Sequence, residues 1–525
     1  MKKKIDLLDT TLRDGAQSQG ISFSIQDKMS IITALDRIGI DYIEAGNPYS
    51  NPKDADFFEV QKNLTLNHSK LVAFGSTRRA DTAPENDSGI LALVNAGTEI
   101  VSIFGKSWDI QAESILNTTL LENLNMISSS VKYMTAHNKR VFYDAEHFFD
   151  GYKSNPEYAL KTVLSAQEAG AEIIVLCDTN GGCLPAEIYE ITGFVKQKLN
   201  IPVGIHCHND SDLAVACTLA GVQAGAEQVQ GTIIGFGERC GNANLSSIIP
   251  NLQLKMKLPC ISPDSLGLLT HTTKTIAEIA NVKLPANMPF VGKNAFAHKG
   301  GMHVDGVVKQ SSSFEHIPPN AVGNSRSLVL SEMAGRSAVA EYIHKIAPQT
   351  ALTKESKKVI EITEMLKRLE FEGYQFEGAN ASFELRVKKN LSLLNSFFTL
   401  ESYRVIGQQK DADGDSVTAE ISITVDGESV FAQQKGDGPV HALDKALRSA
   451  VCKFYPQIEN MRLCDYKVRV IEAADATAAK VRVLIESTDQ KSVWDTIGVS
   501  SDIIYASLLA LIDAIEYKLM KDSCG

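Results

Sequence analysis

The sequence lacks paired cysteines. Its 525 residues include nine cysteines, which are scattered along the chain without a Cys-x-x-Cys spacing. A disulfide framework needs an even set of partners and a zinc-sulfur site needs closely spaced pairs, so the pattern disfavours both. We therefore expect reduced thiols, most of them small core residues.

The sequence also lacks a long apolar run. No segment is both long enough and apolar enough to span a bilayer, although hydrophobic residues make up 44% of the chain. Residues 1–4 include three lysines, but the apolar run after them is short and is interrupted by Asp6 and Asp9, which argues against a secretory signal. We expect a cytoplasmic protein without a membrane partner.

An excess of basic residues is absent as well. The formal net charge is -11, whereas a general nucleic-acid binder needs a concentrated basic face. The charge balance therefore argues against nucleic-acid partners. Small anionic substrates stay possible, because a few local cations are enough to bind them.

What the chain has, up to about residue 260, is an alternation of short apolar runs with longer segments of helical spacing. The runs that we interpret as strands are 5–9, 41–45, 70–74, 99–104, 140–146, 172–178, 202–208 and 228–234. The helical segments between them are 25–38, 55–66, 85–96, 112–137, 156–169, 185–198, 213–224 and 245–257. Eight such units predict a closed (β/α)8 TIM barrel. An open doubly wound sheet is the alternative.

Polar residues gather at the carboxyl ends of these predicted strands, where TIM barrels place their chemistry. In chain order they are Arg13, Asp14, Glu44, Asn47, Ser76, Thr77, Arg78, Lys106, Asp144, Glu146, Asp178, Thr179, Asn180, His206, His208, Asn209, Glu238, Arg239 and Asn242. Burying such a ring is costly unless its members satisfy one another. We expect the active site there.

The rest of the chain changes character twice. Residues 263–395 hold shorter helices and a turn-rich passage over 296–306. From 396 onward, runs of period-2 alternation lead into a helix over 440–454, and the order recurs before a helix over 503–519. We predict a barrel over 1–262, a small, mostly helical linker subdomain over 263–395 and a C-terminal α+β domain of duplicated β-β-β-α units over 396–525.

Two histidines on the seventh predicted strand form a candidate metal site. His206 and His208 share one face of the strand because successive side chains alternate. Neighbouring barrel strands bring Asp14 and Asn242 to the same end, which gives two nitrogens and two oxygens. This mixed set suits Mn²⁺, Zn²⁺ or Co²⁺ somewhat better than Mg²⁺. Hydrogen-bonded core histidines are the alternative.

Four motifs carry a resemblance to a known family. They are DTTLRDGAQ, IHCHNDSDLA, GTIIGFGERCGNANL and AFAHKGGMHVDG. As a set they resemble the 2-isopropylmalate synthase superfamily, whose members condense an acyl-CoA with a 2-oxo acid and include homocitrate and citramalate synthases. Further stretches, among them AFGSTRR, IFGKSWD, CDTNGG and SIIPNLQLKM, narrow the resemblance to the long-form (R)-citramalate synthases.

The resemblance implies roles for individual residues. The implied metal ligands are Asp14, His206, His208 and Asn242; the implied catalytic residues are Arg13, Glu146, His303 and Asp305; the implied substrate contacts are Arg13, Glu44, Tyr143, Asp144, Glu146 and Thr179. Arg13 would stabilise developing negative charge, and His303 with Asp305 would assist proton transfer. The implied substrates are pyruvate and acetyl-CoA. The implied assembly is a homodimer or higher homo-oligomer, with isoleucine as feedback inhibitor at the C-terminal domain.

The chain departs from the family pattern at two places. Phe314 stands where relatives usually have tyrosine, and Asn47-Pro48-Tyr49 replaces a Trp-Pro-Gly sequence. We expect side chains near Asn47, Tyr49, Tyr143 and Lys106 to decide which 2-oxo acid is accepted. The alternatives are a 2-isopropylmalate synthase, or a related enzyme for another 2-oxo acid, and a non-catalytic regulatory paralogue.

Overall fold

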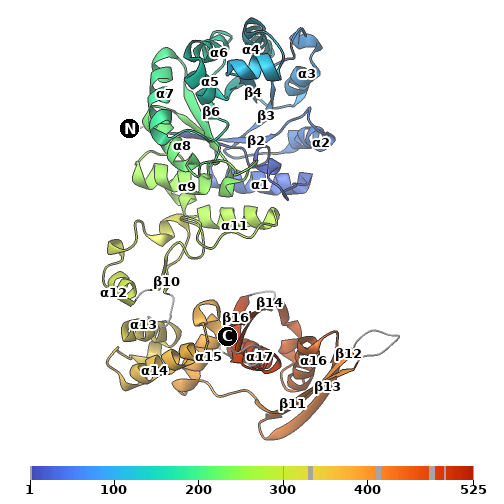
Figure 1. Ribbon diagram of the computed structural model, residues 1–525, viewed down its shortest axis with the longest axis vertical. Coiled ribbons are helices and arrows are strands. Elements are labelled where there is room, and N and C mark those ends of the chain that lie inside the picture. Colours follow the sequence, from blue (N-terminus) through green and yellow to red (C-terminus); the bar gives the residue numbers. More distant parts are fainter. Residues whose placement is uncertain are drawn as a thin grey trace. The chain divides into compact units, whose positions relative to one another are not determined.

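The computed structural model describes residues 3–299, 301–328, 335–408, 416–471, 479–489 and 492–523. The chain forms two compact units (Figure 1). Unit 1 comprises Met1–Phe296 and Ile317–Arg326, and unit 2 comprises Ala297–His316 and Ser327–Gly525. The predicted borders at residues 262 and 395 stay predictions.

Unit 1 is built around eight parallel strands that close into a barrel. They are β1 (Asp6–Asp9), β2 (Tyr42–Gly46), β3 (Lys70–Ser76), β4 (Ile100–Lys106), β5 (Arg140–Glu146), β6 (Ile173–Asp178), β7 (Val203–Cys207) and β8 (Gln228–Gly231). β1 pairs with both β2 and β8. This closure confirms the predicted TIM barrel and excludes the open sheet.

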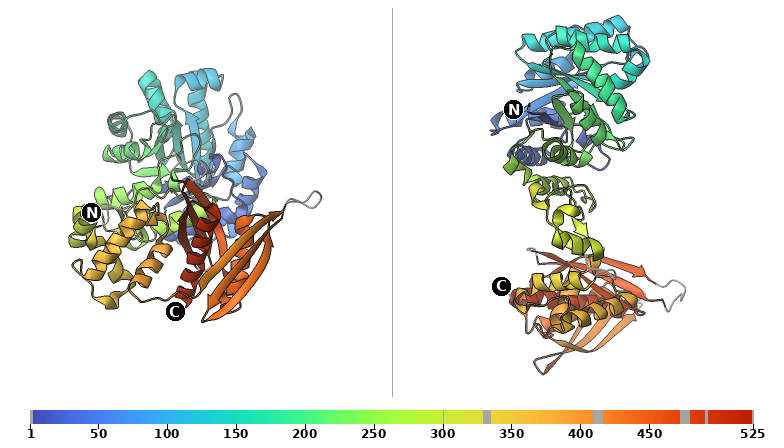
Figure 2. Two further views of the ribbon diagram at one scale, coloured as in Figure 1. Left: turned by 60° about the horizontal axis from the view of Figure 1, so that its bottom comes forward. Right: turned by 90° about the vertical axis from the view of Figure 1, so that its left-hand side faces the viewer.

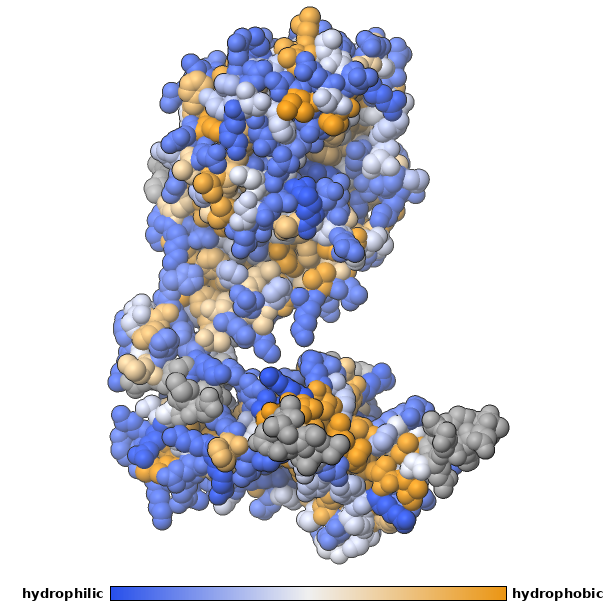
Figure 3. Space-filling model, viewed as in Figure 1, coloured by the Kyte–Doolittle hydropathy of each residue, from blue (hydrophilic) through white to orange (hydrophobic). Residues whose placement is uncertain are grey.

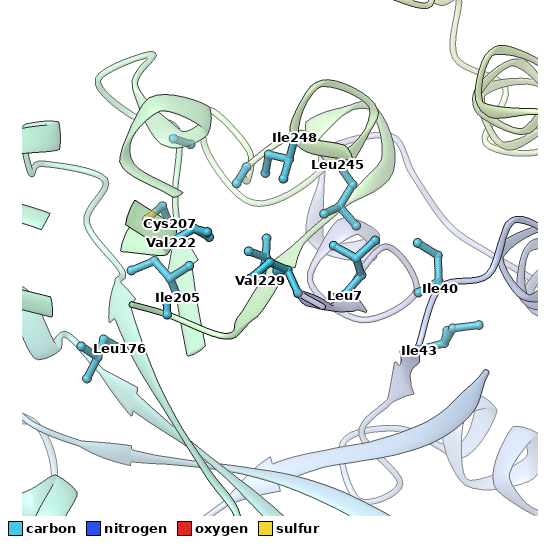
Figure 4. Packing of buried hydrophobic residues seen from close by; sticks show 14 of the residues in the cluster. Leu7, Ile40, Ile43, Leu176, Ile205, Cys207, Val222, Val229, Leu245 and Ile248 are labelled. Atoms are coloured by element: carbon cyan, nitrogen blue, oxygen red, sulfur yellow. The ribbon is translucent and has the colours of Figure 1, made fainter. Parts of the chain in front are cut away.

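The barrel strands are apolar on both faces, because one face fills the barrel and the other packs against helices. Leu8, Val72 and Phe142 belong to the inner cluster. Leu7, Ile43, Leu176, Ile205 and Val229 point outward and pack with helix residues such as Ile248 (Figure 4). Alternate side chains along each strand therefore point into the barrel lumen or outward into the core between barrel and helices.

The helices of unit 1 surround the barrel (Figure 1). They are α1 (Ile25–Ile38), α2 (Pro52–Val60), α3 (Ser88–Asn95), α4 (Leu120–Ala136), α5 (Phe148–Ser154), α6 (Pro156–Glu168), α7 (Pro185–Lys198), α8 (Ala214–Gln223), α9 (Leu245–Pro250), α10 (Pro263–Leu266) and α11 (Leu269–Ile279). α1 begins with a capping box in which Ser24 and Asp27 exchange hydrogen bonds, and it ends at Gly39, whose φ is 84°. Both of its predicted ends are confirmed.

Four helix predictions were wrong in their bounds or continuity. The helices predicted over 55–66 and 85–96 span Pro52–Val60 and Ser88–Asn95. The segment 112–137 is interrupted, because Asn117 has a φ of 51° and Thr119 starts α4 by accepting from the backbone N–H of Glu122. The segment 245–257 is an α-helix only as far as Pro250 and continues as a π-helix over Asn251–Lys255. A left-handed residue and a proline each interrupt the regular helical hydrogen bonding.

Unit 2 begins with short elements and helices. They are β9 (Ala297–His298), α12 (Gly301–Lys309), β10 (Ser327–Leu328), α13 (Arg336–Ile346), α14 (Lys357–Phe371) and α15 (Asn380–Asn390). The passage 296–306, which we predicted to be turn-rich, is helical from Gly301 onward. Residues 304, 339, 362 and 383 belong to the apolar core of this part.

The C-terminal part of unit 2 repeats one β-β-β-α order, as predicted. The first copy is β11 (Thr399–Gln408), β12 (Ser416–Val425), β13 (Glu428–Gly436) and α16 (Pro439–Val451), and the second is β14 (Arg462–Val470), β15 (Val481–Thr488), β16 (Val493–Ser500) and α17 (Ile503–Ser523). Each sheet is antiparallel. α17 lies along its sheet (Figure 2), and Leu443, Leu447 and Leu511 belong to the shared core.

The polarity of the surface and the state of the cysteines are those expected from the sequence. On the face shown in Figure 3, apolar residues of the barrel unit are scattered among hydrophilic ones, as on ordinary protein surfaces. All eight cysteines within the described ranges are free. In the described part of the chain, none of the helices combines the length and the apolar character needed to cross a membrane.

Candidate active site

The turn after β1 places Arg13 and Asp14 at the carboxyl end of the barrel. The backbone N–H groups of Arg13 and Gly15 both donate to the carbonyl of Thr10, at 3.1 and 3.0 Å. The N–H of Thr10 in turn donates to the carbonyl of Gly231 at 2.8 Å. The turn is thus fixed to the end of β8, which holds both side chains over the barrel mouth.

Asp14, His206 and His208 converge on one point. All three side chains are buried, and one donor atom from each lies within 4.8 Å of the other two. Nε2 of His206 lies 3.4 Å from Nε2 of His208 and 3.5 Å from Oδ2 of Asp14. Metal–nitrogen bonds of about 2.0–2.1 Å in a tetrahedral site separate two nitrogens by roughly 3.3 Å. The spacing therefore fits a shared divalent ion.

The protonation of the cluster also suits a metal. Burial lowers the pKa of His208 to about 4, and His206 adds to that lowering. Burial alone would raise the pKa of Asp14, but Arg13 and the two histidines bring it below its usual value. At neutral pH the carboxylate is therefore ionised and His208 is neutral, which are the forms that bind metals.

Asn242 completes the donor set that the sequence predicted. It pairs with His208 in an isolated β-bridge, and its side chain hydrogen-bonds Asp14. Its amide donates to the carbonyl of Phe236 at 3.1 Å. Its Oδ1 is buried and accepts no hydrogen bond from the described residues. A buried oxygen without a partner is costly, and a metal ion would satisfy it.

Arg13 is locked in place beside this cluster. Its Nε donates to Oε2 of Glu44 at 2.6 Å, and its Nη1 lies 3.2 Å from Oδ2 of Asp14. The guanidinium carbon lies 3.8 Å from the ring centroid of Phe74. Burial raises the pKa of Glu44 to about 7, although Arg13 lowers it. Glu44 thus contacts Arg13 and positions the cation.

Arg13 and the cluster of Asp14, His206 and His208 line a cavity of about 230 Å³, whereas Asn242 is not among its lining residues. Seven of the predicted site residues are among its lining residues, namely Arg13, Asp14, Asp144, Glu146, Thr179, His206 and His208. Glu146 forms an ion pair with Lys106. Oγ1 of Thr179 accepts from the backbone N–H of His147 at 2.8 Å, which fixes its orientation.

Two predicted substrate contacts lie elsewhere in unit 1. Tyr143 lies on the outward face of β5, in the core between barrel and helices, and is fully buried. Glu44 is fully buried behind Arg13. Neither residue is among those that line this cavity. Their contacts with substrate stay predictions, and the placement supports an indirect role for Glu44.

The loop residues expected to select the substrate also lie outside this cavity. Asn47 lines a neighbouring hollow of about 260 Å³, which shares Arg13 and Phe74 with the first. The hydroxyl of Tyr49 accepts from Nη2 of Arg79 at 2.8 Å, and half of the Tyr49 surface is exposed (50%). Selection by these two residues stays a prediction.

His303 belongs to unit 2, on α12. Its side chain is exposed, and its ring centroid lies 4.9 Å from that of Phe314. The side chain of Asp305 lies outside the described residues. The structure therefore places His303 next to Phe314, one of the two positions at which the chain departs from the family pattern that it resembles.

The sequence interpretation missed several cavity residues. Phe74 and Phe104 line it as a stacked pair with ring centroids 5.3 Å apart, and Gln17 and Cys177 also contribute. Phe74 and Phe104 were the last residues of two predicted strands. Their position at the strand ends was the signal, but an apolar side chain there was interpreted as core.

Comparison with known proteins finds three family models along the chain. Residues 4–280 match the HMGL-like family, residues 290–373 match the homocitrate synthase post-HMGL domain-like family, and residues 377–519 match the LeuA allosteric (dimerisation) domain. The HMGL-like match covers the barrel with all four candidate metal residues.

Three relatives match the chain over nearly its whole length. A protein of Aquifex aeolicus named (R)-citramalate synthase is 49% identical over 99% of both chains, and one of Geobacter sulfurreducens with the same name is 48% identical over 98% of both. A protein of Methanopyrus kandleri named Probable 2-isopropylmalate synthase is 31% identical over 98% of both. Because identity is much higher to the first two over equal coverage, the chain belongs to the HMGL-like family and, within it, to the (R)-citramalate synthases.

Proposed function

We propose that the protein condenses acetyl-CoA with pyruvate and water to give (R)-citramalate and CoA, as a step of isoleucine biosynthesis. The observation that carries the proposal is the convergence of Asp14, His206 and His208 beside the guanidinium of Arg13 in one cavity. A cavity of about 230 Å³ suits a small 2-oxo acid. The shared name of the relatives that are 49% and 48% identical supports pyruvate as that acid.

The ligands of a divalent metal would be Asp14, His206, His208 and Asn242. Two nitrogens and two oxygens favour Mn²⁺, Zn²⁺ or Co²⁺ over Mg²⁺, which prefers oxygen alone. When bound, such an ion supplies Lewis-acid polarisation of the keto group. The ionised Asp14 and the neutral His208 support this assignment.

The protein's own groups bind and orient the 2-oxo acid. Arg13 places a fixed cation where negative charge develops on the keto oxygen, and Glu44 holds that cation still. Glu146 and Thr179 contact the acid from other strands of the barrel. Asp144 lies deeper and is hydrogen-bonded by Ser102.

Proton transfer is assigned to His303, with Asp305 as its partner. A base removes a proton from the methyl group of acetyl-CoA, and the carbanion forms a carbon–carbon bond to the keto carbon. The keto oxygen then takes a proton and becomes a hydroxyl. Water cleaves the thioester, which releases CoA and makes the overall reaction effectively irreversible. A neutral imidazole is a competent base near pH 7.

The test is an assay of CoA thiol release. Purified protein is incubated with acetyl-CoA and, in turn, pyruvate, 2-oxobutyrate and 2-oxoisovalerate, with and without added divalent metal. We expect metal-dependent release with pyruvate. Release with 2-oxoisovalerate instead would indicate a 2-isopropylmalate synthase, and no release with any acid would indicate the non-catalytic paralogue.

A domain of the LeuA allosteric (dimerisation) type spans residues 377–519, which supports a homodimer or higher homo-oligomer. We assign feedback inhibition by isoleucine to this domain, and the duplicated β-β-β-α units support two related halves around the inhibitor. Titration of the intact enzyme with isoleucine, valine and leucine checks the assignment. Equal insensitivity to all three amino acids would contradict it.

A further inference from the structure

Four buried side chains from four strands form one hydrogen-bonded chain that ends at the candidate metal site. Oγ of Ser102 donates to Oδ2 of Asp144 at 3.0 Å, and Nε2 of Gln230 donates to Oδ1 of the same carboxylate at 3.2 Å. Oε1 of Gln230 lies 3.0 Å from Nδ1 of His206. None of the four residues is more than 5% exposed.

The register between β7 and β8 brings the side chains of His206 and Gln230 together. His206 on β7 and Gln230 on β8 are direct Cα partners in the parallel pair. Directly paired side chains on neighbouring strands point to the same face of the sheet, here the barrel lumen. The hydrogen bond therefore follows from the closure of the barrel and not from a flexible loop.

The donors and acceptors of these side chains fix the direction of the hydrogen bonds. A carboxylate can only accept hydrogen bonds, so the amide of Gln230 presents its NH₂ to Asp144. Its carbonyl oxygen then faces His206, and a carbonyl can only accept. Nδ1 of His206 therefore carries the ring proton. In a neutral imidazole this leaves the lone pair on Nε2, the atom that faces His208 and Asp14.

We propose that Gln230 is a positioning residue that sets the tautomer of His206 for metal binding, and that Asp144 sets the orientation of Gln230. This inference rests on the metal site of the proposed function. It assigns Asp144 a role behind the ligands, in addition to any contact with substrate. Partners behind a metal ligand commonly change metal affinity by about 10–100-fold when they are removed.

A glutamine in the barrel lumen does not necessarily contact a metal ligand, as the neighbouring Gln228 shows. Gln228 is also buried on β8, and its Nε2 has no hydrogen-bond partner among the described residues. Its Oε1 lies 3.5 Å from Nε2 of Gln230, at the edge of hydrogen-bond distance. Among these two amides, only that of Gln230 connects a carboxylate to a metal ligand.

The experiment measures the affinity of the metal-free enzyme for Co²⁺, by competition with a chromogenic chelator. Visible Co²⁺ absorption reports ligand geometry independently of activity. We expect Gln230→Met to weaken Co²⁺ binding by about 10–100-fold. As a matched control, Gln61→Met removes another buried amide, which donates only to the carbonyls of Phe58 and Ala96, and is expected to leave Co²⁺ affinity unchanged.

Exchanging the hydrogen-bonding roles of the side chains at 144 and 230 tests the direction of these hydrogen bonds. Gln230→Glu alone sets two carboxylates against each other, whereas Asp144→Asn alone keeps an oxygen that can still accept from the amide of Gln230. The double variant Asp144→Asn/Gln230→Glu exchanges donor and acceptor at constant net charge, so the group at 144 donates and that at 230 still accepts from Nδ1 of His206. We expect Gln230→Glu alone to bind Co²⁺ weakly and the double variant to recover most of the wild-type affinity.

The outcomes are distinct. If the wild-type protein binds no Co²⁺, Zn²⁺ or Mn²⁺, the metal site of the proposed function fails, and this inference fails with it. If the wild type binds and Gln230→Met binds equally well, the inference alone is overturned. Failure of the double variant to bind Co²⁺ more tightly than Gln230→Glu also overturns it. Should Gln230→Met not fold, as judged by circular dichroism, the single and double charge variants decide.

Discussion

Nε2 of His206 and Nε2 of His208 lie 3.4 Å apart with Asp14 beside them. Two neutral imidazole nitrogens that each present a lone pair repel one another unless a cation lies between them. The same carboxylate is 3.2 Å from the Arg13 guanidinium. Asp14 would thus serve both the Arg13 guanidinium and a bound metal ion, and this shared arrangement separates the roles of Arg13 and Asp14.

Asp14→Asn and Arg13→Lys should therefore fail in different ways. Asp14→Asn removes a charged metal ligand and is expected to weaken metal binding by more than the roughly 100-fold typical of outer partners. Arg13→Lys keeps the positive charge but cannot hold Glu44 and face the cavity together, so metal stays bound while kcat falls by about 10²–10³-fold. Chelator competition and steady-state kinetics check both. The same defect in both variants would contradict the division.

The stacked aromatic pair predicts substrate size selection. Phe74 and Phe104 line the cavity at an interplanar angle of 18°. Phe104→Ala removes a ring and is expected to raise the kcat/KM ratio of 2-oxoisovalerate to pyruvate by at least about 10-fold, the effect of one or two methylene groups. Phe194→Ala, on α7 outside the cavity, is the control and should leave the ratio unchanged. An unchanged ratio in Phe104→Ala would rule out this role.

Asp9 predicts a pH-dependent stability. Burial raises its pKa to about 7, although hydrogen bonds from Thr11 lower it. The fold therefore favours the protonated acid, and its contribution to stability is complete below the unfolded pKa of about 3.9 and is lost as the pH rises through about 7. The loss has a slope of up to about 1.4 kcal/mol per pH unit.

Asp9→Asn cannot titrate and should remove this part of the pH dependence. Urea unfolding of wild type and variant at pH 5, 6, 7 and 8 measures the difference. We expect the variant to gain stability relative to wild type as the pH rises. A difference that stays constant across the range would show that Asp9 has an ordinary pKa.

Substitution of His303 should lower the reaction rate without weakening metal binding. His303→Gln is expected to lower kcat by about 10²–10⁴-fold, the usual effect of losing an acid–base group, and to leave Co²⁺ affinity unchanged. His344→Gln, an exposed histidine on α13 of the same unit, is the control. Equal activity of His303→Gln and wild type would remove His303 from the mechanism.

The elements that were predicted correctly are those whose pattern is local. The capping box at Ser24 and the left-handed Gly39 fix both ends of α1 within a few residues, so the sequence alone was sufficient. The break before α4 was also encoded locally, in Asn117 and Thr119, but apolar periodicity on both sides concealed it.

The metal cluster could be predicted because ionisable residues are rarely buried without a reason. The support around it could not, since it depends on register between strands. Gln228 and Gln230 lie within the predicted strand 228–234 and were not singled out, and only the pairing of β7 with β8 shows that Gln230 meets His206. Phe74 and Phe104 were hidden for the opposite reason, because an apolar residue at a strand end resembles core.

The pairing of β1 with β8 has a consequence for synthesis of the protein on the ribosome. Asp14 emerges early, whereas the paired His208 and Asn242 emerge about two hundred residues later. The metal site therefore cannot assemble on the growing chain until the last barrel strand has left the exit tunnel. Because metal binding is coupled to folding, a bound ion would stabilise only the completed barrel. Every shorter folding intermediate would lack this stabilisation.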